Sequence, residues 1–365
     1  MNDRSLVIDA LAYQRNKAFG YQEYLFNLLN YFFEYREQLK YERIIVVCDQ
    51  TQNDDFLQFK DKFEIVDFRV PNLLFRFYAQ FIFPYKLGLC KQDVILHTAN
   101  YSSLIKNCIN ILVIHDLLYL RKKMLPNFLM RLQRRIYVPR SVALADVIIA
   151  ISEFTKQDIL QNIPQSRVKN IVCIYNYFNF EKYKLGSKKS KCLVDCSYFL
   201  CVSSSAYHKN MITVLKAFEK FCSLNKKLNF CFVGDFGNSE ACTYYEGLNV
   251  DVRERIHILK NISNAELSLL YADCEAYVTA TLFEGLGMPI VEAMYFNAPL
   301  ILSDLEVCRE VSNNQGVFFD PNSADELCAK MLNFVKPHIN SHDYVVDKFA
   351  AINTSQKYID ILNNI

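Results

Sequence analysis

Short runs of β-branched and aromatic residues alternate with amphipathic segments along the whole chain, and this alternation restricts the fold more than any other feature. Strands that alternate with helices favour parallel sheets with helices on both faces. The strands are expected at residues 6–8, 43–47, 64–68, 94–97, 109–114, 147–151, 169–174, 198–202, 229–233, 256–259, 276–279, 300–302 and 317–319. The helices are expected at residues 21–33, 211–221, 265–271, 289–296, 324–335 and 349–362. The chain is therefore predicted to be an α/β protein.

The length of the chain indicates more than one domain. A chain of 365 residues is too long for one ordinary core, since most domains hold about 100–200 residues. The segment EKYKLGSKKSK at 181–191 is polar and basic and contains a Gly-Ser step, which is typical of a linker. We predict two doubly wound domains, at 1–182 and 192–345, joined by a linker at 183–191 and facing each other across a cleft. The helical segment at 346–365 is expected to pack across the domain junction.

Composition and the N-terminal residues indicate a globular protein without a membrane span. Hydrophobic residues make up 52% of the chain, charged residues make up 22%, and the net charge is +2. The sequence MNDRSLVIDA carries charges and then a strand pattern, so it does not resemble a signal peptide. No uncharged apolar run reaches the roughly 18 residues that a transmembrane helix needs. We therefore expect a cytoplasmic protein, at most peripheral at the inner face of the membrane.

The cysteine and histidine patterns do not indicate a metal site. The thirteen cysteines are scattered without a Cys-x-x-Cys pair, and the nearest cluster, Cys192, Cys196 and Cys201, lacks histidine partners. Reduced thiols in the core are expected, rather than disulfides or zinc ligands. His338 and His342 are four residues apart in a polar segment, which favours a surface pair over a zinc site.

The stretch LFEGLGMPIVEA at 282–293 places two glutamates on either side of a glycine-rich turn. Gly285 and Gly287 have no side chains, so the backbone N–H groups of the turn can approach a ligand closely. A helix start behind such a turn favours an anion such as phosphate. Glu284 and Glu292 instead suit hydroxyl groups, and together these groups describe a nucleotide diphosphate sugar. A plain helix start, with Glu292 in a salt bridge, is the alternative interpretation.

The segment FEGLGMPIVEA at 283–293 resembles the signature of family 4 glycosyltransferases, E-G-F/L-G-x-P-x-x-E-A. That family contains retaining enzymes of the GT-B fold, in which two Rossmann-like domains face each other across a cleft. The resemblance implies that Glu284 acts at the donor sugar and that Glu292 contacts the nucleotide ribose. Further donor-binding residues that it implies are Gly285, Leu286, Gly287 and Met288.

A second segment, FLCVSSSAYHKN at 199–210, is similar to the family's strand and loop that end in Arg-Lys-Asn. The resemblance implies that the Lys209 cation neutralises the diphosphate, where negative charge builds up as the glycosidic bond breaks. His208 stands where the family usually has an arginine, so a weaker positive field and a donor-binding role are expected there. Gly234 follows the strand at 229–233 and is expected to border the nucleotide base.

Two positions in the first half extend the resemblance. In INILVIHDLL at 109–118, an apolar strand ends at His115 with Asp116 behind it, where open sheets bind ligands. A His-Asp step here resembles the family's own, which implies that His115 is a catalytic-site residue; a structural histidine is the alternative. Gly20 precedes the helix pattern at 21–33 and resembles, more loosely, the family's glycine loop beneath the donor phosphate.

The segment at 119–140 carries seven basic residues and no acid. Its helical pattern puts Phe128, Leu129, Leu132 and Ile136 on one face and Arg131, Arg134 and Arg135 on the other. A basic amphipathic surface fits an anionic membrane and hence a lipid-linked acceptor. A core-facing helix with a solvated basic face is the alternative. No nucleic-acid-binding fold accompanies the charge, so nucleic acid is not an expected partner.

Taken together, the resemblance implies a retaining glycosyltransferase that transfers a sugar from a UDP- or GDP-sugar. The expected acceptor is a saccharide or a lipid-linked saccharide, in the synthesis of a bacterial surface polysaccharide such as O-antigen or capsule. The chain has no Asp-x-Asp motif, so neither a metal nor another cofactor is expected. Two alternatives stay open: a nucleotide-sugar epimerase on the same fold, and a catalytically silent glycosyltransferase-like subunit.

Overall fold

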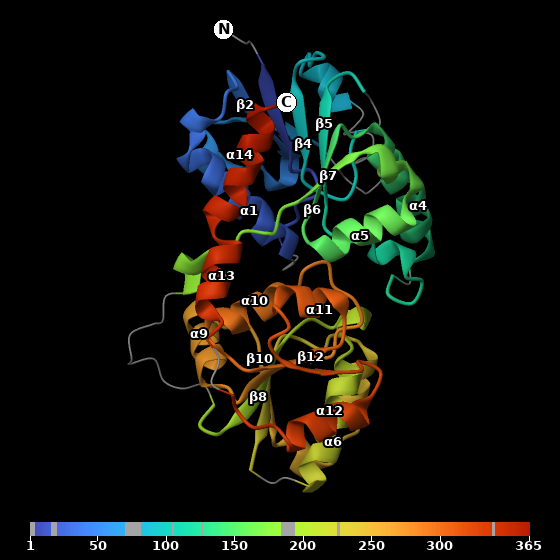
Figure 1. Ribbon diagram of the computed structural model, residues 1–365, viewed down its shortest axis with the longest axis vertical. Coiled ribbons are helices and arrows are strands. Elements are labelled where there is room, and N and C mark those ends of the chain that lie inside the picture. The colour runs from blue at the N-terminus through green and yellow to red at the C-terminus, as the bar shows by residue number, and fades with distance from the viewer. Residues whose placement is uncertain are drawn as a thin grey trace. The chain divides into compact units, whose positions relative to one another are not determined.

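The structure is a computed structural model that describes residues 4–15, 20–69, 82–103, 106–125, 127–183, 194–224, 227–337 and 340–365. The chain divides into two compact units (Figure 1). Unit 1 comprises Met1–Phe178 and Phe349–Ile365, and unit 2 comprises Asn179–Lys348. The predicted linker at 183–191 lies, apart from Tyr183, outside the described residues.

Unit 1 contains a parallel sheet of seven strands in the order β3-β2-β1-β4-β5-β6-β7. The strands are β1 (Ser5–Asp9), β2 (Arg43–Asp49), β3 (Glu64–Phe68), β4 (Val94–His97), β5 (Ile109–Ile114), β6 (Val147–Ala150) and β7 (Asn170–Cys173). Every residue of β1, β4 and β6 is buried, as expected of parallel strands covered on both faces. The strand order changes direction between β1 and β4, where Asp9 lies opposite His97.

The main helices of unit 1 are α1 (Gly20–Glu34), α2 (Asn53–Phe56), α4 (Phe128–Leu144), α5 (Glu153–Asn162) and α14 (Ser355–Asn363). The C-terminal α14 lies beside α1 (Figure 1), with the Tyr24 and Tyr358 hydroxyls 3.0 Å apart. The single helix predicted at 349–362 is wrong. α13 (His342–Phe349) ends there, Ala350 is extended at ψ 151°, and a short 3-10 turn (Ala351–Asn353) precedes α14.

Unit 2 contains a parallel sheet of six strands in the order β10-β9-β8-β11-β12-β13. They are β8 (Tyr198–Val202), β9 (Asn229–Val233), β10 (Ile256–Leu259), β11 (Ala276–Thr279), β12 (Leu300–Ser303) and β13 (Val317–Phe319). The helices include α6 (Met211–Leu224), α7 (Glu240–Glu246), α8 (Val250–Arg253), α9 (Asn264–Asp273), α10 (Met288–Tyr295), α11 (Glu306–Val311) and α12 (Ala324–Leu332). Here the strand order changes direction between β8 and β11, which are hydrogen-bonded neighbours.

The predicted α/β architecture is confirmed, because each of the thirteen expected strands coincides with an observed strand to within about two residues at either end. Both sheets are doubly wound, and in such sheets ligands bind beyond the carboxyl ends of the strands where the order changes direction. That place is the end of β1 and β4 in unit 1 and the end of β8 and β11 in unit 2. Among the described residues, no helix is both long enough and apolar enough to cross a membrane.

Candidate functional site

Lys209 and Glu284 form an ion pair at the carboxyl ends of β8 and β11. The Lys209 Nζ donates a hydrogen bond of 2.5 Å to Glu284 Oε1. The two side chains keep only 21% and 15% of their surface exposed, so the pair is well shielded but still reachable from solvent. Charge-assisted hydrogen bonds of this kind are stronger than neutral ones. The structure therefore brings together two residues that the sequence analysis identified from segments 75 positions apart.

Hydrogen bonds to backbone carbonyls hold together the loops that carry this pair. The carbonyl of His208 accepts from the Leu282 N–H at 2.7 Å and from the Thr281 hydroxyl at 3.0 Å. Asn210, in the left-handed region at φ 57°, donates from its side chain to the carbonyls of Ala280 and Pro321, at 2.9 and 2.7 Å. The loop after β8 and the loop after β11 are thereby fixed against each other.

In the glycine-rich turn, Gly287 has a backbone conformation that favours glycine. Gly287 adopts φ +89° as the N-cap of α10, and a Cβ there would lie 3.2 Å from the Ile290 Cδ1. Leu286 is buried beside it, and Met288 begins the helix. Gly285 has no positive φ, so its backbone conformation does not itself demand glycine. The N–H groups of Gly287 and Met288 lie at the start of α10, where a helix N-terminus favours an anion. Pro289 has no N–H, and the Ile290 N–H already donates to the Gly287 carbonyl at 2.9 Å.

Gly234 lies at the end of β9 and is required by its surroundings. Its φ is +148°, and a Cβ at this position would lie only 2.0 Å from the Ser203 carbonyl oxygen. Its N–H donates to the Leu259 carbonyl at 3.0 Å, which ties the ends of β9 and β10 together. The close approach of two backbone segments accounts for the glycine, and the expected contact with a nucleotide base stays a prediction.

Glu292 is buried in α10, as the apolar surroundings of the motif suggested. Its Oε1 accepts from the Tyr183 hydroxyl at 3.1 Å, and its Oε2 accepts from the Tyr271 hydroxyl at 2.7 Å. Burial, together with the adjacent Glu292 charge, raises the pKa of Tyr271 well above its ordinary value, so this hydroxyl stays a donor. Glu292 is thus held by two tyrosine hydroxyls. These two contacts are hydrogen bonds from neutral groups and not the salt bridge of the alternative interpretation.

A third tyrosine lies near both glutamates. Tyr277, on β11, is buried, and this burial raises its pKa well above the ordinary value, with smaller contributions from Cys201, Glu284 and Glu292. Tyr183, Tyr271 and Tyr277 were not identified from the sequence as site residues. The sequence signal for such partners was a glutamate within an apolar helix, because a buried carboxylate requires hydrogen-bond donors close by.

His115 lies in unit 1, at the end of β5. Its Nε2 is 2.8 Å from the Thr98 carbonyl oxygen, which fixes Nε2 as the protonated nitrogen of the neutral ring. The rings of Tyr21 and Tyr24 pack nearly perpendicular to the imidazole, at centroid distances of 5.6 and 4.8 Å. Burial lowers the pKa of His115, against the smaller effects of the Thr98 hydrogen bond and Asp116. The imidazole is therefore neutral at physiological pH.

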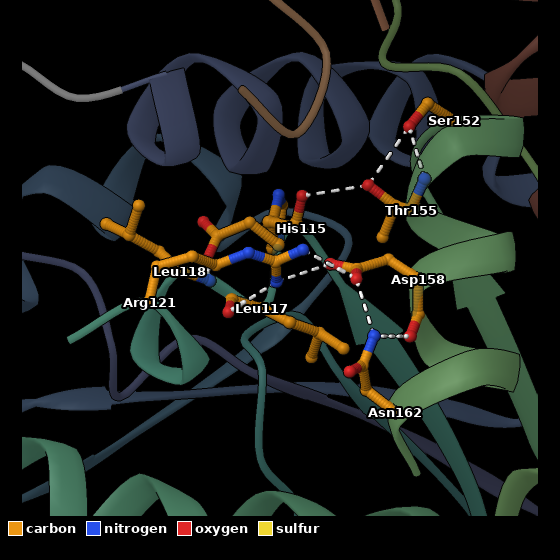
Figure 2. Close-up of polar contacts among 9 residues, drawn as sticks. His115, Leu117, Leu118, Arg121, Ser152, Thr155, Asp158 and Asn162 are labelled. Carbon is orange, nitrogen blue, oxygen red and sulfur yellow. Dashed lines mark hydrogen bonds and ion pairs between the residues drawn. The ribbon is translucent and has the colours of Figure 1, made fainter. Parts of the chain in front are cut away.

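An ion pair anchors the loop that follows His115, as Figure 2 shows. Arg121 donates to both carboxylate oxygens of Asp158 at 2.7 Å and to the Leu117 carbonyl at 3.0 Å. Asp158, on α5, also accepts from Asn162 at 2.8 Å. At the other end of the loop, the Thr155 hydroxyl lies 3.4 Å from the His115 carbonyl oxygen. The sequence analysis assigned Arg121 only to a basic surface, but its charge is paired.

Buried polar groups also meet where the strand order of unit 1 changes direction. His97 Nδ1 lies 2.9 Å from Asp9 Oδ2, and its Nε2 lies 3.1 Å from Asn110 Oδ1. The Thr98 hydroxyl donates to the Asp9 carbonyl at 2.6 Å. The sequence analysis missed this cluster, whose signal was a polar residue ending each of two apolar strands.

Gly20 begins α1, and a methyl group added there would meet no atom within 4 Å, so the fold does not itself require glycine at this position.

No group of three or more His, Cys, Asp or Glu side chains in the described part of the chain is placed to hold a metal ion. His342 Nδ1 lies 2.7 Å from the Tyr295 carbonyl oxygen, and His338, its predicted surface partner, falls outside the described residues. The twelve cysteines within the described residues are not joined to one another by disulfides, and most of them are buried.

Solved structures with this architecture are GT-B glycosyltransferases, and the chain has the GT-B fold. Sucrose-phosphate synthase from Thermosynechococcus elongatus gives a TM-score of 0.75 at 14% identity, over 99% of this chain and 98% of that one. Anabaena HepE in complex with UDP and glucose gives a TM-score of 0.72 at 16% identity, over 99% of this chain and 100% of that one.

Sequence comparison relates the second half of the chain to one family of glycosyltransferases. Residues 187–345 match the model of the family described as glycosyl transferases group 1. The O-antigen chain mannosyltransferase RfbU of Salmonella typhimurium is 26% identical over 196 residues, which are 54% of this chain and 53% of that protein. The O-antigen chain mannosyltransferase B of Escherichia coli is 24% identical over 202 residues, 52% and 51% of the two chains. The chain thus matches about half the length of each relative.

Proposed function

We propose that the protein is a retaining glycosyltransferase that uses a nucleotide-diphosphate sugar as its donor. The observation that carries this proposal is the Lys209–Glu284 ion pair, held at 2.5 Å where the strand order of unit 2 changes direction. It lies beside the glycine-rich turn at the start of α10, so a cation, a carboxylate and the first backbone amides of a helix come together in one place. The match of residues 187–345 to glycosyl transferases group 1 supports the same class.

Each of these groups has a part in binding the donor. The Lys209 ammonium and the amides around Gly287 and Met288 neutralise the diphosphate, because both favour negative charge. Glu284 positions the donor sugar through its hydroxyl groups. Glu292, oriented by two tyrosine hydroxyls, accepts hydrogen bonds from the ribose.

In the proposed transfer step, negative charge develops on the departing phosphate. The bond between the anomeric carbon and the departing diphosphate oxygen breaks, and the acceptor oxygen bonds to that carbon on the same face. The proton of the acceptor hydroxyl passes to the departing phosphate oxygen. Lys209 then stabilises the growing negative charge, which is where a fixed cation lowers the barrier. His115, neutral and fixed by Thr98, is proposed to contact the sugar as an uncharged group.

The proposed acceptor is a saccharide or lipid-linked saccharide in bacterial surface polysaccharide synthesis. The named relatives support this setting, since two of them are O-antigen chain mannosyltransferases. Their names favour a mannosyl donor, whereas the HepE complex with UDP and glucose favours a UDP-glucose donor. The donor is therefore a UDP- or GDP-sugar, and no metal is needed if Lys209 and the helix amides bind the diphosphate.

A thermal-shift screen with UDP, GDP, UDP-glucose and GDP-mannose tests the donor. A ligand that binds only the folded state at about 100 times its Kd stabilises it by about 2.7 kcal/mol, which raises the melting temperature measurably. The responding donor is then incubated with short oligosaccharide acceptors, and NMR of the product reports the anomeric configuration. Retention is expected; an inverted product would overturn the proposed mechanism.

Two variants separate the remaining outcomes. Glu284→Ala should abolish transfer while the fold stays intact. Lys220→Ala removes an exposed lysine of α6 that pairs with Asp325 of α12, and it should leave transfer unchanged. Nucleotide binding without turnover of any donor would favour a silent subunit. Conversion of the donor to its epimer in the absence of acceptor would favour an epimerase.

A further inference from the structure

The first half of α4 exposes its apolar side chains. Phe128, Leu129, Leu132 and Ile136 are 61%, 74%, 45% and 43% exposed, and we call these four residues the α4 face. The buried residues of the helix, Val138, Ser141 and Val142, are confined to its second half. α4 lies at the outer edge of unit 1 (Figure 1). The first half of the helix therefore leaves its apolar side in solvent, whereas the second half packs on the core of unit 1 through Val138 and Val142.

The α4 face is a continuous stripe. At about 100° of rotation per residue, its four members fall within a sector of about 100°. Arg135 lies about 20° beyond one edge of that sector, and Arg140 lies about 20° beyond the other. The exposed side of the helix thus has an apolar centre with an arginine on either side. A single exposed apolar residue needs no explanation, but four in one stripe indicate an interaction site.

The charged residues of the segment that carries the α4 face are all basic. The segment 119–140 contains no acidic residue. Within the described residues, none of Lys122, Lys123, Arg134 and Arg135 takes part in an ion pair. Arg131 donates to the Lys122 and Leu125 carbonyls, both at 3.2 Å, and so holds the lysine turn against the helix. The turn and the helix form one basic surface.

We propose that the α4 face binds the surface of an anionic lipid membrane. The apolar residues enter the boundary between headgroups and acyl chains, and the long arginine side chains extend to the lipid phosphates. This pairing of chemistries selects the partner. A nucleic acid would use the cations but leave the four apolar side chains in water, and a neutral protein surface would use the apolar stripe but leave the cations without counter-charges.

Vesicle flotation of the full chain tests the proposal without any donor or acceptor, so its result is independent of the proposed function. Vesicles of phosphatidylcholine alone are compared with vesicles containing about one-third phosphatidylglycerol, at low and high salt. The protein should float with the anionic vesicles at low salt and dissociate at high salt, because screening weakens the attraction. Absence from the anionic vesicles at low salt, or equal binding to both kinds, overturns the proposal.

Two double variants test whether the α4 face is responsible for membrane binding. Arg134→Gln combined with Arg135→Gln should weaken binding about 25-fold, since each cation near an anionic surface contributes about fivefold. Phe128→Ser combined with Leu129→Ser should weaken it by at least about tenfold, because two apolar side chains no longer leave water. All four residues have part or most of their surface in solvent, so the folded state should keep its melting temperature.

A matched pair elsewhere on unit 1 is the control. Lys60→Gln combined with Leu57→Ser, at the 3-10 turn Leu57–Phe59, removes one exposed cation and one apolar side chain that is 43% exposed. This variant should bind anionic vesicles as the unaltered protein does, apart from the small effect of one charge. Equal weakening by the control would overturn the assignment to α4. Concentration-dependent self-association that the Phe128→Ser, Leu129→Ser variant abolishes, without vesicle binding, would instead identify a protein contact.

Discussion

The Tyr271 hydroxyl donates a hydrogen bond of 2.7 Å to Glu292 Oε2, and both groups are buried. The Tyr183 hydroxyl approaches the other carboxylate oxygen at 3.1 Å. A buried carboxylate is costly unless hydrogen-bond donors surround it. The two tyrosines therefore fix the orientation of Glu292 before any ligand arrives.

Removing the shorter of these bonds should affect both stability and ligand affinity. Tyr271→Phe leaves one oxygen of a buried carboxylate without this donor, which should lower the free energy of unfolding by about 1–3 kcal/mol. Nucleotide affinity should fall as well, because Glu292 is no longer held. Urea unfolding and nucleotide titration measure the two effects. Tyr358→Phe, at a buried hydroxyl of unit 1 that lies 3.0 Å from the Tyr24 hydroxyl, is the control and should leave nucleotide affinity unchanged.

Lys209 and Glu284 should behave as one unit in transfer kinetics. Lys209→Met and Glu284→Gln should each lower kcat/KM by about 100- to 1000-fold, the usual effect of losing one group that stabilises developing charge. The double variant should be little worse than either single one, because residues in direct contact are coupled. Full additivity of the two losses would contradict a shared role.

Two glycines should respond differently to the same substitution. Gly234→Ala places a methyl group 2.0 Å from the Ser203 carbonyl oxygen, so the backbone must shift, at a cost of about 2–4 kcal/mol in the free energy of unfolding. Gly20→Ala meets no atom within 4 Å and should be neutral or stabilising by up to about 1 kcal/mol. If Gly20→Ala nevertheless lowers transfer, Gly20 has the ligand-contacting role predicted from the sequence. Unchanged transfer would remove it from the site.

The lowered pKa of His115 predicts how stability depends on pH. The unfolded chain binds a proton near the ordinary pKa of about 6.5, whereas the buried ring binds it only at lower pH. The contribution to stability is therefore complete above pH of about 6.5 and decreases as the pH falls, by up to about 1.4 kcal/mol per pH unit. Urea unfolding at pH 7.5 and 5.5 should show a smaller loss for His115→Gln than for the unaltered protein. Equal losses would show that His115 is not the group responsible; His257, whose pKa burial also lowers, is then the next to test.

The Arg121–Asp158 pair should depend on the fork shape of the guanidinium. Arg121→Lys keeps the charge but cannot donate to both oxygens of Asp158 and to the Leu117 carbonyl in the same geometry. A loss of about 1–3 kcal/mol in the free energy of unfolding is expected. Lys122→Arg in the same turn, at an exposed side chain, should have no effect. A neutral Arg121→Lys would show that the charge alone anchors the loop.

Strand positions were predictable because the strands are buried on both faces and therefore appear as short apolar runs between polar segments. The β-branched residues of β5 illustrate this, since 109–114 was predicted and observed with the same bounds. The C-terminal helix was not predicted correctly. Its apolar spacing continues through Ala350, and only the extended backbone there ends one helix before the next begins.

The site was predictable where a motif lies in one continuous stretch, as with Glu284, Gly287 and Glu292. Contacts made between distant segments were not. The tyrosine donors of Glu292 come from positions 183 and 271, and Arg121 reaches Asp158 across 37 positions. No local pattern distinguishes a tyrosine that caps a carboxylate from one that fills a core.

Asn210 gives the loops of unit 2 a property that matters for engineering. Its side-chain amide donates hydrogen bonds to the carbonyls of Ala280 and Pro321. The segments that follow β8, β11 and β13 are therefore joined through this one side chain. Chimeras with another transferase should therefore exchange 207–210, 280–284 and the segment at Pro321 together. Exchanging one of these segments alone would separate groups that are bonded to one another.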